Sequence, residues 1–498
     1  MNRLGGDVHG GPFRLNVAKV KVPLSAVLAA WLGSKAGAGL LWLGRHPLVV
    51  APVLAVWLLA RVTDALGGVP LLLVLVLTVA GLVVWRVRWR ESFTRQVTWR
   101  LRGLWRGRFV YRFAWQPAMV TTGLAVTLGA REYLPKIRSI RSTGSVDRVR
   151  VRMLPGQTME DWADAAPRLA QTFAAQECRV RTLDGKRQEL VLWFLVHDPL
   201  TQPVEPFPAA HQSVDFTGLP VARREDGLTY RLRLLGTHLL VVGATGSGKG
   251  PVIWSLITAL APSIREGSCQ VWALDPKGGM ELAGGRGLFS RFVYGDPDDA
   301  ADDGPGNGSG YEVEFARVLE DAVTVMRRRQ ATLRGVTRLH SPTPEEPLVV
   351  VVVDELASLT AYVTDRDAKR RIAAALSLLL SQGRAVGVTV VGAVQDPRKD
   401  IVAMRDLFPT RIALRLSEAE QVALVLGSGA RDRGARCDAI PESLPGVGYV
   451  GIDGVAEPVR VRFSHITDAH IDALAADHDP TSKVTGERPV QRSGEVAA

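Results

Sequence analysis

The sequence predicts an α/β protein whose largest part is a central parallel sheet with a ligand site at one edge. Three observations lead to this fold class. Apolar runs at Leu239–Val242, Leu348–Val353 and Val388–Val394 have the length and composition of buried strands. Helical patterns separate these runs, and strands that alternate with helices form a doubly wound parallel sheet. Such a sheet binds its ligand at the carboxyl ends of the strands.

The glycine-rich segment after Leu239–Val242 fits the phosphate-binding pattern G-x-x-x-x-G-K. Its glycines let successive backbone N–H groups face a polyphosphate, and the start of the following helix adds positive potential. Lys249 has the reach to contact the β and γ phosphates. A glycine turn that binds nothing is the alternative, but it leaves Lys249 unexplained. The predicted nucleotide-binding residues are Gly243, Ala244, Thr245, Gly246, Ser247, Gly248, Lys249 and Gly250.

Gly250 departs from this pattern, which expects a Ser or Thr hydroxyl there as a ligand of Mg²⁺. Two interpretations follow. Either water and acidic residues further along the chain hold the metal, or the nucleotide is bound and hydrolysed slowly. We favour the first interpretation.

An acidic pair, Asp354 and Glu355, follows the apolar strand Leu348–Val353 directly. In a P-loop enzyme an acidic residue at the end of such a strand holds Mg²⁺, and a neighbouring glutamate polarises the attacking water. We therefore expect ATP and Mg²⁺ as cofactors, with Asp354 as the metal ligand and Glu355 as the water-orienting residue. Gln395, at the end of Val388–Val394, is placed to sense a γ-phosphate.

Composition restricts the partners and the number of structural units. A chain of 498 residues has room for about three units, and its formal charge of +11 suggests a polyanionic partner, nucleic acid or anionic lipid. The cysteines Cys178, Cys269 and Cys437 are widely separated, so they predict neither a disulfide framework nor a clustered metal site.

The N-terminal part predicts a membrane anchor. Residues 1–46 form a basic, amphipathic segment, in which 22–44 is apolar but interrupted. Residues 47–85 contain two apolar stretches, Pro47–Ala60 and Leu66–Trp85, that fit a transmembrane helical hairpin. The expected location is the cell membrane, with two spans and a cytoplasmic motor domain.

The Arg/Trp-rich segment 86–133 follows the hairpin. Between Arg86 and Arg112 its single acidic residue is Glu91, which places this flank in the cytoplasm by the positive-inside rule. Aromatic residues between the arginines are typical of an interfacial helix lying on anionic lipid, although they also suit nucleic acid. Residues 116–130 are too short and too polar for a third span.

From residue 134 the pattern becomes that of a soluble protein. We expect a small α/β domain at 134–200, a motor domain at 201–465 and a short, largely disordered tail at 466–498. The remaining predicted elements are strands at 146–153, 178–182, 190–196, 270–274 and 411–416, helices at 159–176, 311–338 and 466–476, a proline-rich linker at 199–208 and an acidic surface loop at 296–310.

The motifs of the motor domain, in their order and spacing, resemble the FtsK/SpoIIIE family of DNA-pumping ATPases across residues 237–463. Within that family, the chain is most similar to plasmid and integrative-element transfer proteins of mycelial actinobacteria. The shared features are a short membrane hairpin, an arginine-rich composition and the GKG form of the P-loop. The matching segments are GATGSGK at 243–249, LDPKGGMEL at 274–282, VVVVVDELASL at 349–359, GRAVGVTVVGAVQDP at 383–397 and PTRIALRL at 409–416.

This resemblance implies a RecA-like P-loop NTPase that works as a homo-oligomer, a hexameric ring that drives double-stranded DNA between cells, with other transfer proteins as further partners. It also implies that Arg384 acts as an arginine finger on a neighbouring subunit's nucleotide, with Arg411 as the second candidate. Arg327–Arg329 and Lys369–Arg371 are candidates for DNA phosphate contacts, and solvated helix faces are the alternative.

The C-terminus differs from the family pattern. The residues after Phe463 are too few for the winged-helix module that many relatives carry, so we expect loading specificity to come from another protein, from 134–200, or not to exist. Three alternative functions remain. They are a chromosome-segregation FtsK-type translocase, a protein-secretion ATPase of the same superfamily, and a membrane scaffold that binds nucleotide without hydrolysing it.

Overall fold

The computed structural model describes residues 69–129, 131–183, 185–207, 214–295, 310–398 and 404–478. The chain divides into two compact units, Met1–Gln96 and Val97–Ala498, which are described separately. The predictions for 1–46, for the first span at 47–60, for most of the loop at 296–310 and for 479–498 lie outside the described residues.

The described part of the first unit is helical. It contains α3 (Val69–Arg88), α4 (Arg90–Phe93) and the start of the π-helical segment η1 (Thr94–Thr98). In the described part of the chain, no helix combines the length and the apolar character that crossing a membrane requires. The predicted transmembrane hairpin is therefore not supported.

The second unit opens with a helix that belongs to a small α/β domain. The helix consists of α5 (Trp99–Arg106), a π-helical turn η2 (Gly107–Tyr111) and α6 (Arg112–Thr121). A hairpin, β1 and β2, follows, and then a sheet in the order β3-β4-β6-β5 with one helix, α7. The bounds are β1 Val126–Leu128, β2 Arg131–Tyr133, β3 Lys136–Ser142, β4 Val146–Arg152, α7 Met159–Thr172, β5 Glu177–Thr182 and β6 Glu189–Leu195.

The strands and the helix predicted for this domain are confirmed, but its predicted start at residue 134 omits the helix α5–α6. Tyr111 and Trp115 of that helix are buried in the same core as Trp162 and Phe194. The buried carboxylate of Asp147 on β4 accepts a hydrogen bond from the Tyr111 hydroxyl at 2.8 Å. The prediction that these aromatic residues face lipid is therefore wrong for Tyr111 and Trp115, which fill a protein core.

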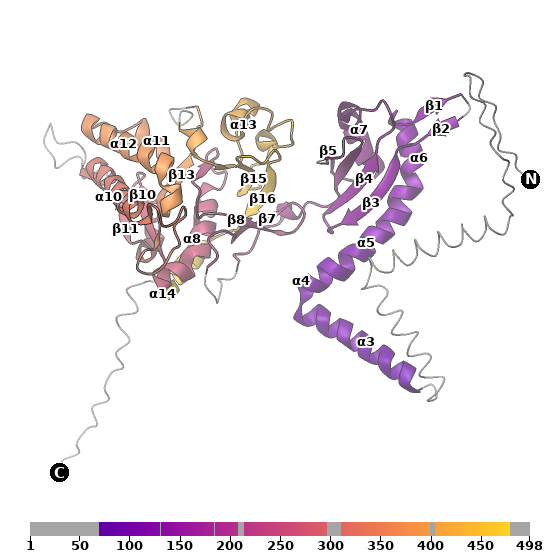
Figure 1. Ribbon diagram of the computed structural model, residues 1–498, viewed down its shortest axis with the longest axis horizontal. Coiled ribbons are helices and arrows are strands. Elements are labelled where there is room, and N and C mark those ends of the chain that lie inside the picture. Colours follow the sequence, from indigo (N-terminus) through magenta and orange to yellow (C-terminus); the bar gives the residue numbers. More distant parts are fainter. Residues whose placement is uncertain are drawn as a thin grey trace, which may run out of the picture. The chain divides into compact units, whose positions relative to one another are not determined.

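The motor domain is a sheet of ten described strands, ordered β11-β10-β12-β13-β9-β14-β15-β16-β7-β8. Figure 1 shows β10 and β11 toward one end of this sheet and β7, β8 and β16 toward the other. The strands from β11 to β14 are parallel to one another, and the pairs from β14–β15 to β7–β8 are antiparallel. The central parallel sheet predicted from the sequence is confirmed. The strand bounds are β7 Leu219–Arg224, β8 Thr229–Leu232, β9 Leu239–Val242, β10 Cys269–Asp275, β11 Arg291–Tyr294, β12 Leu348–Val353, β13 Val388–Val394, β14 Thr410–Ala413, β15 Val447–Ile452 and β16 Val459–Phe463.

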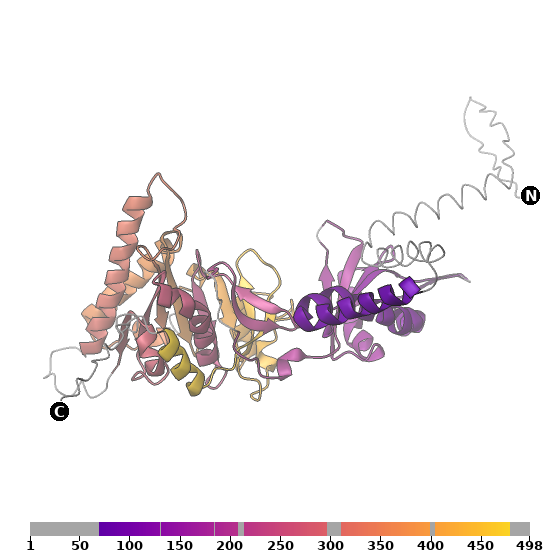
Figure 2. The ribbon, with the colours of Figure 1, turned by 90° about the horizontal axis from the view of Figure 1, so that it is seen from below.

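Helices cover both faces of the parallel strands. Alternate residues of β12 show this: Val349, Val351 and Val353 pack in one core with α10 and α12, while Val350 and Val352 pack in another with α8 and α14. In Figure 2 the yellow helix α14 lies beside α8. The helix bounds are α8 Lys249–Glu266, α10 Gly310–Leu333, α11 Leu356–Thr360, α12 Arg366–Gln382, α13 Ala419–Leu426 and α14 Asp468–His478, with the short 3₁₀ turns η3 Pro199–Thr201, η4 Ala283–Leu288, η5 Arg384–Val386, η7 Arg405–Leu407 and η8 Cys437–Ala439.

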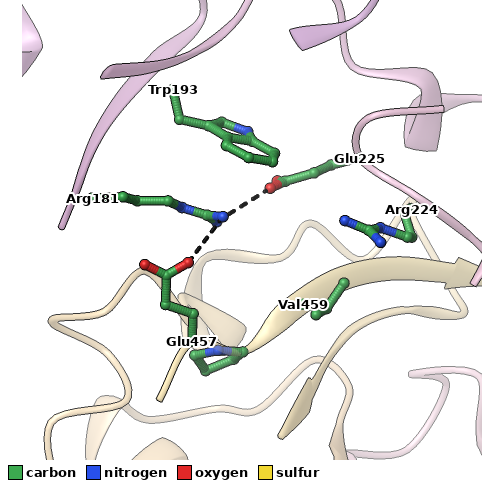
Figure 3. Close-up of a pocket in the computed structure, with 7 residues that line it drawn as sticks. Arg181, Trp193, Arg224, Glu225, Glu457 and Val459 are labelled. Carbon is green, nitrogen blue, oxygen red and sulfur yellow. Dashed lines mark ion pairs between the residues drawn. The ribbon is translucent and has the colours of Figure 1, made fainter. Parts of the chain in front are cut away.

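An ion-pair network joins the small domain to the motor, and Figure 3 shows its part around Arg181, which pairs with Glu225 and Glu457. The network pairs Arg148 with Asp226 at 2.8 Å, Arg179 with Glu225 at 2.9 Å and Arg181 with Glu457 at 2.9 Å. The guanidinium groups of Arg148 and Arg181 each lie 4.0 Å from the ring centre of Trp193. The pocket at this joint is about 50 Å³, far below the few hundred Å³ of a typical ligand site, so we interpret it as a structural contact.

Candidate nucleotide-binding site

The loop between β9 and α8 has a backbone that only glycine accommodates at one critical point. Gly248 has φ +97°, and a Cβ placed there would lie 2.3 Å from the backbone nitrogen of Gly446. The Gly446 N–H donates to the Ser247 carbonyl at 2.9 Å. The loop is therefore held from beneath by the turn that precedes β15.

The P-loop offers free hydrogen-bond donors to a ligand. Among the described residues, no acceptor contacts the backbone N–H groups of Thr245, Gly246 and Gly248. The Lys249 ammonium donates to the Gly243 carbonyl at 2.9 Å, and burial lowers the pKa of Lys249 while Glu355 opposes this shift. Free N–H groups around a lysine at a helix start fit a polyphosphate, so the donor set suits the phosphates of a nucleotide.

The acidic pair at the end of β12 faces a lysine from the turn that follows the neighbouring strand β10. Asp354 is 2 % exposed and Glu355 is 6 % exposed. The Lys277 ammonium lies 3.2 Å from Asp354 Oδ2 and 3.3 Å from Glu355 Oε2. Burial raises the pKa of Asp354, and Lys277 opposes that shift. Lys277 was not predicted as a site residue, although its position two residues after the end of β10 could have indicated a role.

Gln395 connects the acidic pair to the loop. Its backbone N–H donates to Glu355 Oε1 at 3.4 Å, and its side-chain oxygen accepts from the Thr245 hydroxyl at 3.3 Å. Arg415, which the sequence analysis missed, donates to the Thr245 carbonyl at 2.8 Å. Lys249, Asp354, Glu355 and Gln395 thus meet at one edge of the sheet, where the prediction placed them.

A magnesium ion at this edge would be held by few protein ligands. In the described ranges, no group of three or more ligating side chains is arranged to hold a metal by itself. Mg²⁺ beside a nucleotide typically takes one or two carboxylates and completes its shell with phosphate oxygens and water. Asp354 and Glu355 fit that requirement, and Asp354 stays the predicted ligand.

The two candidate arginine fingers lie away from this edge. Arg384 is exposed in η5, before the amino end of β13, and none of the described residues forms an ion pair with it. Arg411, on β14, forms an ion pair with Asp453. Neither arginine reaches the P-loop of its own chain. This placement is compatible with a finger that acts on a neighbouring subunit, and it leaves that prediction untested.

The six candidate DNA-contacting residues lie in different environments. Arg329 is 3 % exposed and donates to the carbonyls of Val386 at 3.1 Å and Gly387 at 3.0 Å, so its prediction as a DNA contact is wrong. Its guanidinium instead satisfies backbone groups at the amino edge of the sheet. The other pairings occupy Arg328 with Glu346, Arg370 with Asp367 and Arg371 with Glu320, while Lys369 donates to the Ala361 carbonyl.

A glycine-rich loop between a parallel strand and a helix, with an acidic pair at the end of a nearby strand, defines a P-loop NTPase domain. Comparison with known proteins narrows this class. Residues 76–193 match the family described as actinomycete conjugal transfer protein N-terminal domain, and residues 208–294 match the FtsK/SpoIIIE family. These matches confirm the resemblance predicted from the sequence.

Individual relatives agree with these matches. Transfer protein TraSA of Streptomyces ambofaciens is 28% identical over 355 residues, which cover 67% of this chain and 79% of TraSA. DNA translocase FtsK of Staphylococcus aureus is 27% identical over 257 residues, 47% of this chain. This chain matches 29% of the length of that FtsK, so the activity of the whole translocase does not transfer directly.

Solved structures include the pCW3 conjugation coupling protein TcpA, in a monomer form with ATPγS. It is 17% identical, with a TM-score of 0.45, over 73% of this chain and 98% of TcpA. The cytoplasmic domain of the Thermomonospora curvata type VII secretion ATPase EccC is 22% identical, with a TM-score of 0.41, over 53% of this chain and 32% of that chain.

We predict that Gly248→Ala destabilises the protein more than Gly246→Ala does. Both glycines have positive φ, which costs an alanine about 1 kcal/mol, but a Cβ at Gly246 meets no atom within 4 Å. The clash of Gly248→Ala with Gly446 adds about 1–3 kcal/mol. Urea unfolding of the full chain without nucleotide measures the difference, and equal losses would contradict the proposed packing of the loop on Gly446.

Proposed function

We propose that the protein is a membrane-anchored, ATP-driven translocase of double-stranded DNA that serves intercellular transfer of plasmid or integrative-element DNA. The observation that supports it most is the meeting of Lys249, Asp354, Glu355 and Gln395 beside the P-loop. The matches to a conjugal transfer domain and to FtsK/SpoIIIE proteins give that NTPase site its proposed substrate.

The residues of the site suggest how hydrolysis would proceed. Lys249 and the loop N–H groups would bind the phosphates, and Asp354 would hold Mg²⁺, which neutralises charge that develops on the phosphates. The Lys277 ammonium lies between the two carboxylates. It would therefore have to release Asp354 when that carboxylate binds the Mg²⁺ of the nucleotide. Glu355 would then orient the attacking water, and Gln395 would report the γ-phosphate to the loop through Thr245.

We further propose that the chain assembles into a hexameric ring. Arg384 supports this arrangement because it is exposed and lies far from the P-loop of its own chain, so it would complete a site only across a subunit interface. Arg411 would first have to release Asp453. Phosphate contacts inside the ring would be insensitive to sequence and sensitive to salt.

Hydrolysis of ATP by the purified full chain tests this function. We expect duplex DNA to raise turnover by at least about tenfold, single-stranded DNA to raise it less, and Lys249→Ala to remove the stimulated rate because the phosphates lose their cation. Stimulation should fall as salt rises from about 50 to 200 mM.

Other outcomes favour the other functions. Binding of ATP without turnover above that of Lys249→Ala would leave the nucleotide-binding scaffold. Turnover that ignores duplex DNA but responds to a secreted protein would favour the secretion ATPase. Sequence-directed duplex stimulation would favour a chromosome-segregation translocase.

Attachment to the cell membrane, with a cytoplasmic motor, is also a proposal. It is supported by the outward face of α5–α6, where Leu104, Trp105, Phe109 and Phe113 are 58–82% exposed in the described structure. The arginines Arg100, Arg108 and Arg112 are exposed among them. Apolar side chains that project between arginines are typical of a helix face resting on anionic lipid.

Vesicle flotation of the full chain tests this attachment. We expect at least about threefold more binding to vesicles with anionic lipid than to neutral ones, and loss of that preference in Phe109→Ser/Phe113→Ser, because two buried apolar contacts with the bilayer are removed. Val336→Ser, at an exposed apolar side chain of the motor, is the control. An unchanged preference in the double variant would overturn the proposed surface.

A further inference from the structure

The Glu281 carboxylate lies where a side chain at position 250 would begin. A Cβ placed on Gly250 would lie 2.8 Å from Glu281 Oε2, and its other neighbour within 4 Å is the Cδ atom of the same carboxyl group, at 3.9 Å. Gly250 is the second residue of α8, at the position where the phosphate-binding pattern expects a hydroxyl. The Glu281 carboxylate therefore lies where that hydroxyl group would begin.

The backbone of Glu281 is fixed on both sides. Its N–H donates to Asp275 Oδ2 at 3.2 Å, and its carbonyl accepts from Trp254 Nε1 of α8 at 3.2 Å. Asp275, fully buried at the end of β10, also accepts from the N–H groups of Lys277 and Leu282. Asp275 is thus used to shape the loop, and the loop presents Glu281 to the start of α8.

The Glu281 carboxylate itself is unused. Across the part of the chain that the structure describes, it forms no hydrogen bond and no ion pair, and its residue is exposed. An unpaired carboxylate beside Gly250, where the pattern expects a metal-binding hydroxyl, is suited to bind a hard divalent cation.

The geometry points to a role for this residue: Glu281 replaces the missing hydroxyl of the P-loop and, with Asp354, holds the Mg²⁺ that accompanies the nucleotide. Gly250 then leaves room for the carboxylate. This inference rests on the proposed nucleotide site, and it extends the sequence-based interpretation that acidic residues further along the chain hold the metal.

Replacing a neutral hydroxyl by a carboxylate has a consequence that can be measured. Without metal, the negative charge of Glu281 repels the phosphates, whereas with metal it attracts the ion that the phosphates carry. Removal of the charge should therefore shift nucleotide affinity in opposite directions under the two conditions. A purely structural role for Glu281 would weaken binding in both.

The experiment measures binding of a fluorescent ATP analogue to the full chain, in Mg²⁺ and in EDTA. For Glu281→Ala and Glu281→Gln we expect about tenfold weaker binding in Mg²⁺ and equal or tighter binding in EDTA. Glu281→Ala/Gly250→Ser should recover most of the affinity in Mg²⁺, because a hydroxyl then has space. Gly250→Ser alone should not gain affinity. Glu266→Gln, at an exposed acid on the opposite end of α8, is the charge-matched control and should resemble the wild type.

The outcomes separate this inference from the proposed function. Three outcomes would show that Glu281 does not hold the metal, although the nucleotide site stands. Glu281→Ala could keep the wild-type affinity in Mg²⁺, or it could lose affinity equally in Mg²⁺ and EDTA. The third outcome is that adding Gly250→Ser to Glu281→Ala restores no affinity in Mg²⁺. If the wild type binds no nucleotide in either condition, or binds it as well after Lys249→Ala, the proposed function itself fails.

Discussion

Burial of the parallel strands on both faces is the constraint on which the site depends. β12 is apolar along its whole length because helices cover it above and below, so it can carry charged residues only where it ends. β10 ends in Asp275, β12 is followed by Asp354 and Glu355, and β13 by Gln395. Because these strands are parallel and in register, their ends lie side by side, and the P-loop after β9 completes the row.

Opposite charges stabilise this row in the absence of a nucleotide. Lys277 compensates the two carboxylates that burial would otherwise disfavour, and Lys249 rests on a carbonyl of its own loop. A phosphate could replace the Gly243 carbonyl as the partner of Lys249, and a cation could replace Lys277 as the partner of the two carboxylates. The site is thus built as a set of exchangeable ion pairs on a rigid sheet, while its most deeply buried acid, Asp275, is committed to backbone groups.

Local sequence patterns predicted the parts of this site that lie within one segment. The P-loop, β12 with its acidic pair, and β13 with Gln395 could be read from apolar runs and from the residue that follows each run. The proposed role of Glu281 could not, because it depends on the approach of the loop after β10 to the start of α8. At Gly250 the sequence showed only that the expected hydroxyl is absent. Arg329 was predicted wrongly for a related reason. An arginine on a charged helix usually faces solvent, but Arg329 donates to carbonyl groups at the amino edge of the sheet. The aromatic residues of the helix α5–α6 lie in two environments. Tyr111 and Trp115 are buried in a protein core, while Phe109 and Phe113 are exposed.

The central claim is that the energy of ATP hydrolysis at this site moves duplex DNA. Displacement of a third strand from a triplex region of linear duplex DNA measures movement directly and independently of turnover. The full chain should displace the third strand in the presence of Mg²⁺ and ATP, and neither Lys249→Ala nor the wild type with a non-hydrolysable analogue should do so. Hydrolysis that duplex DNA stimulates but that never displaces the strand would contradict the account, because the protein would then be a DNA-dependent ATPase and not a translocase.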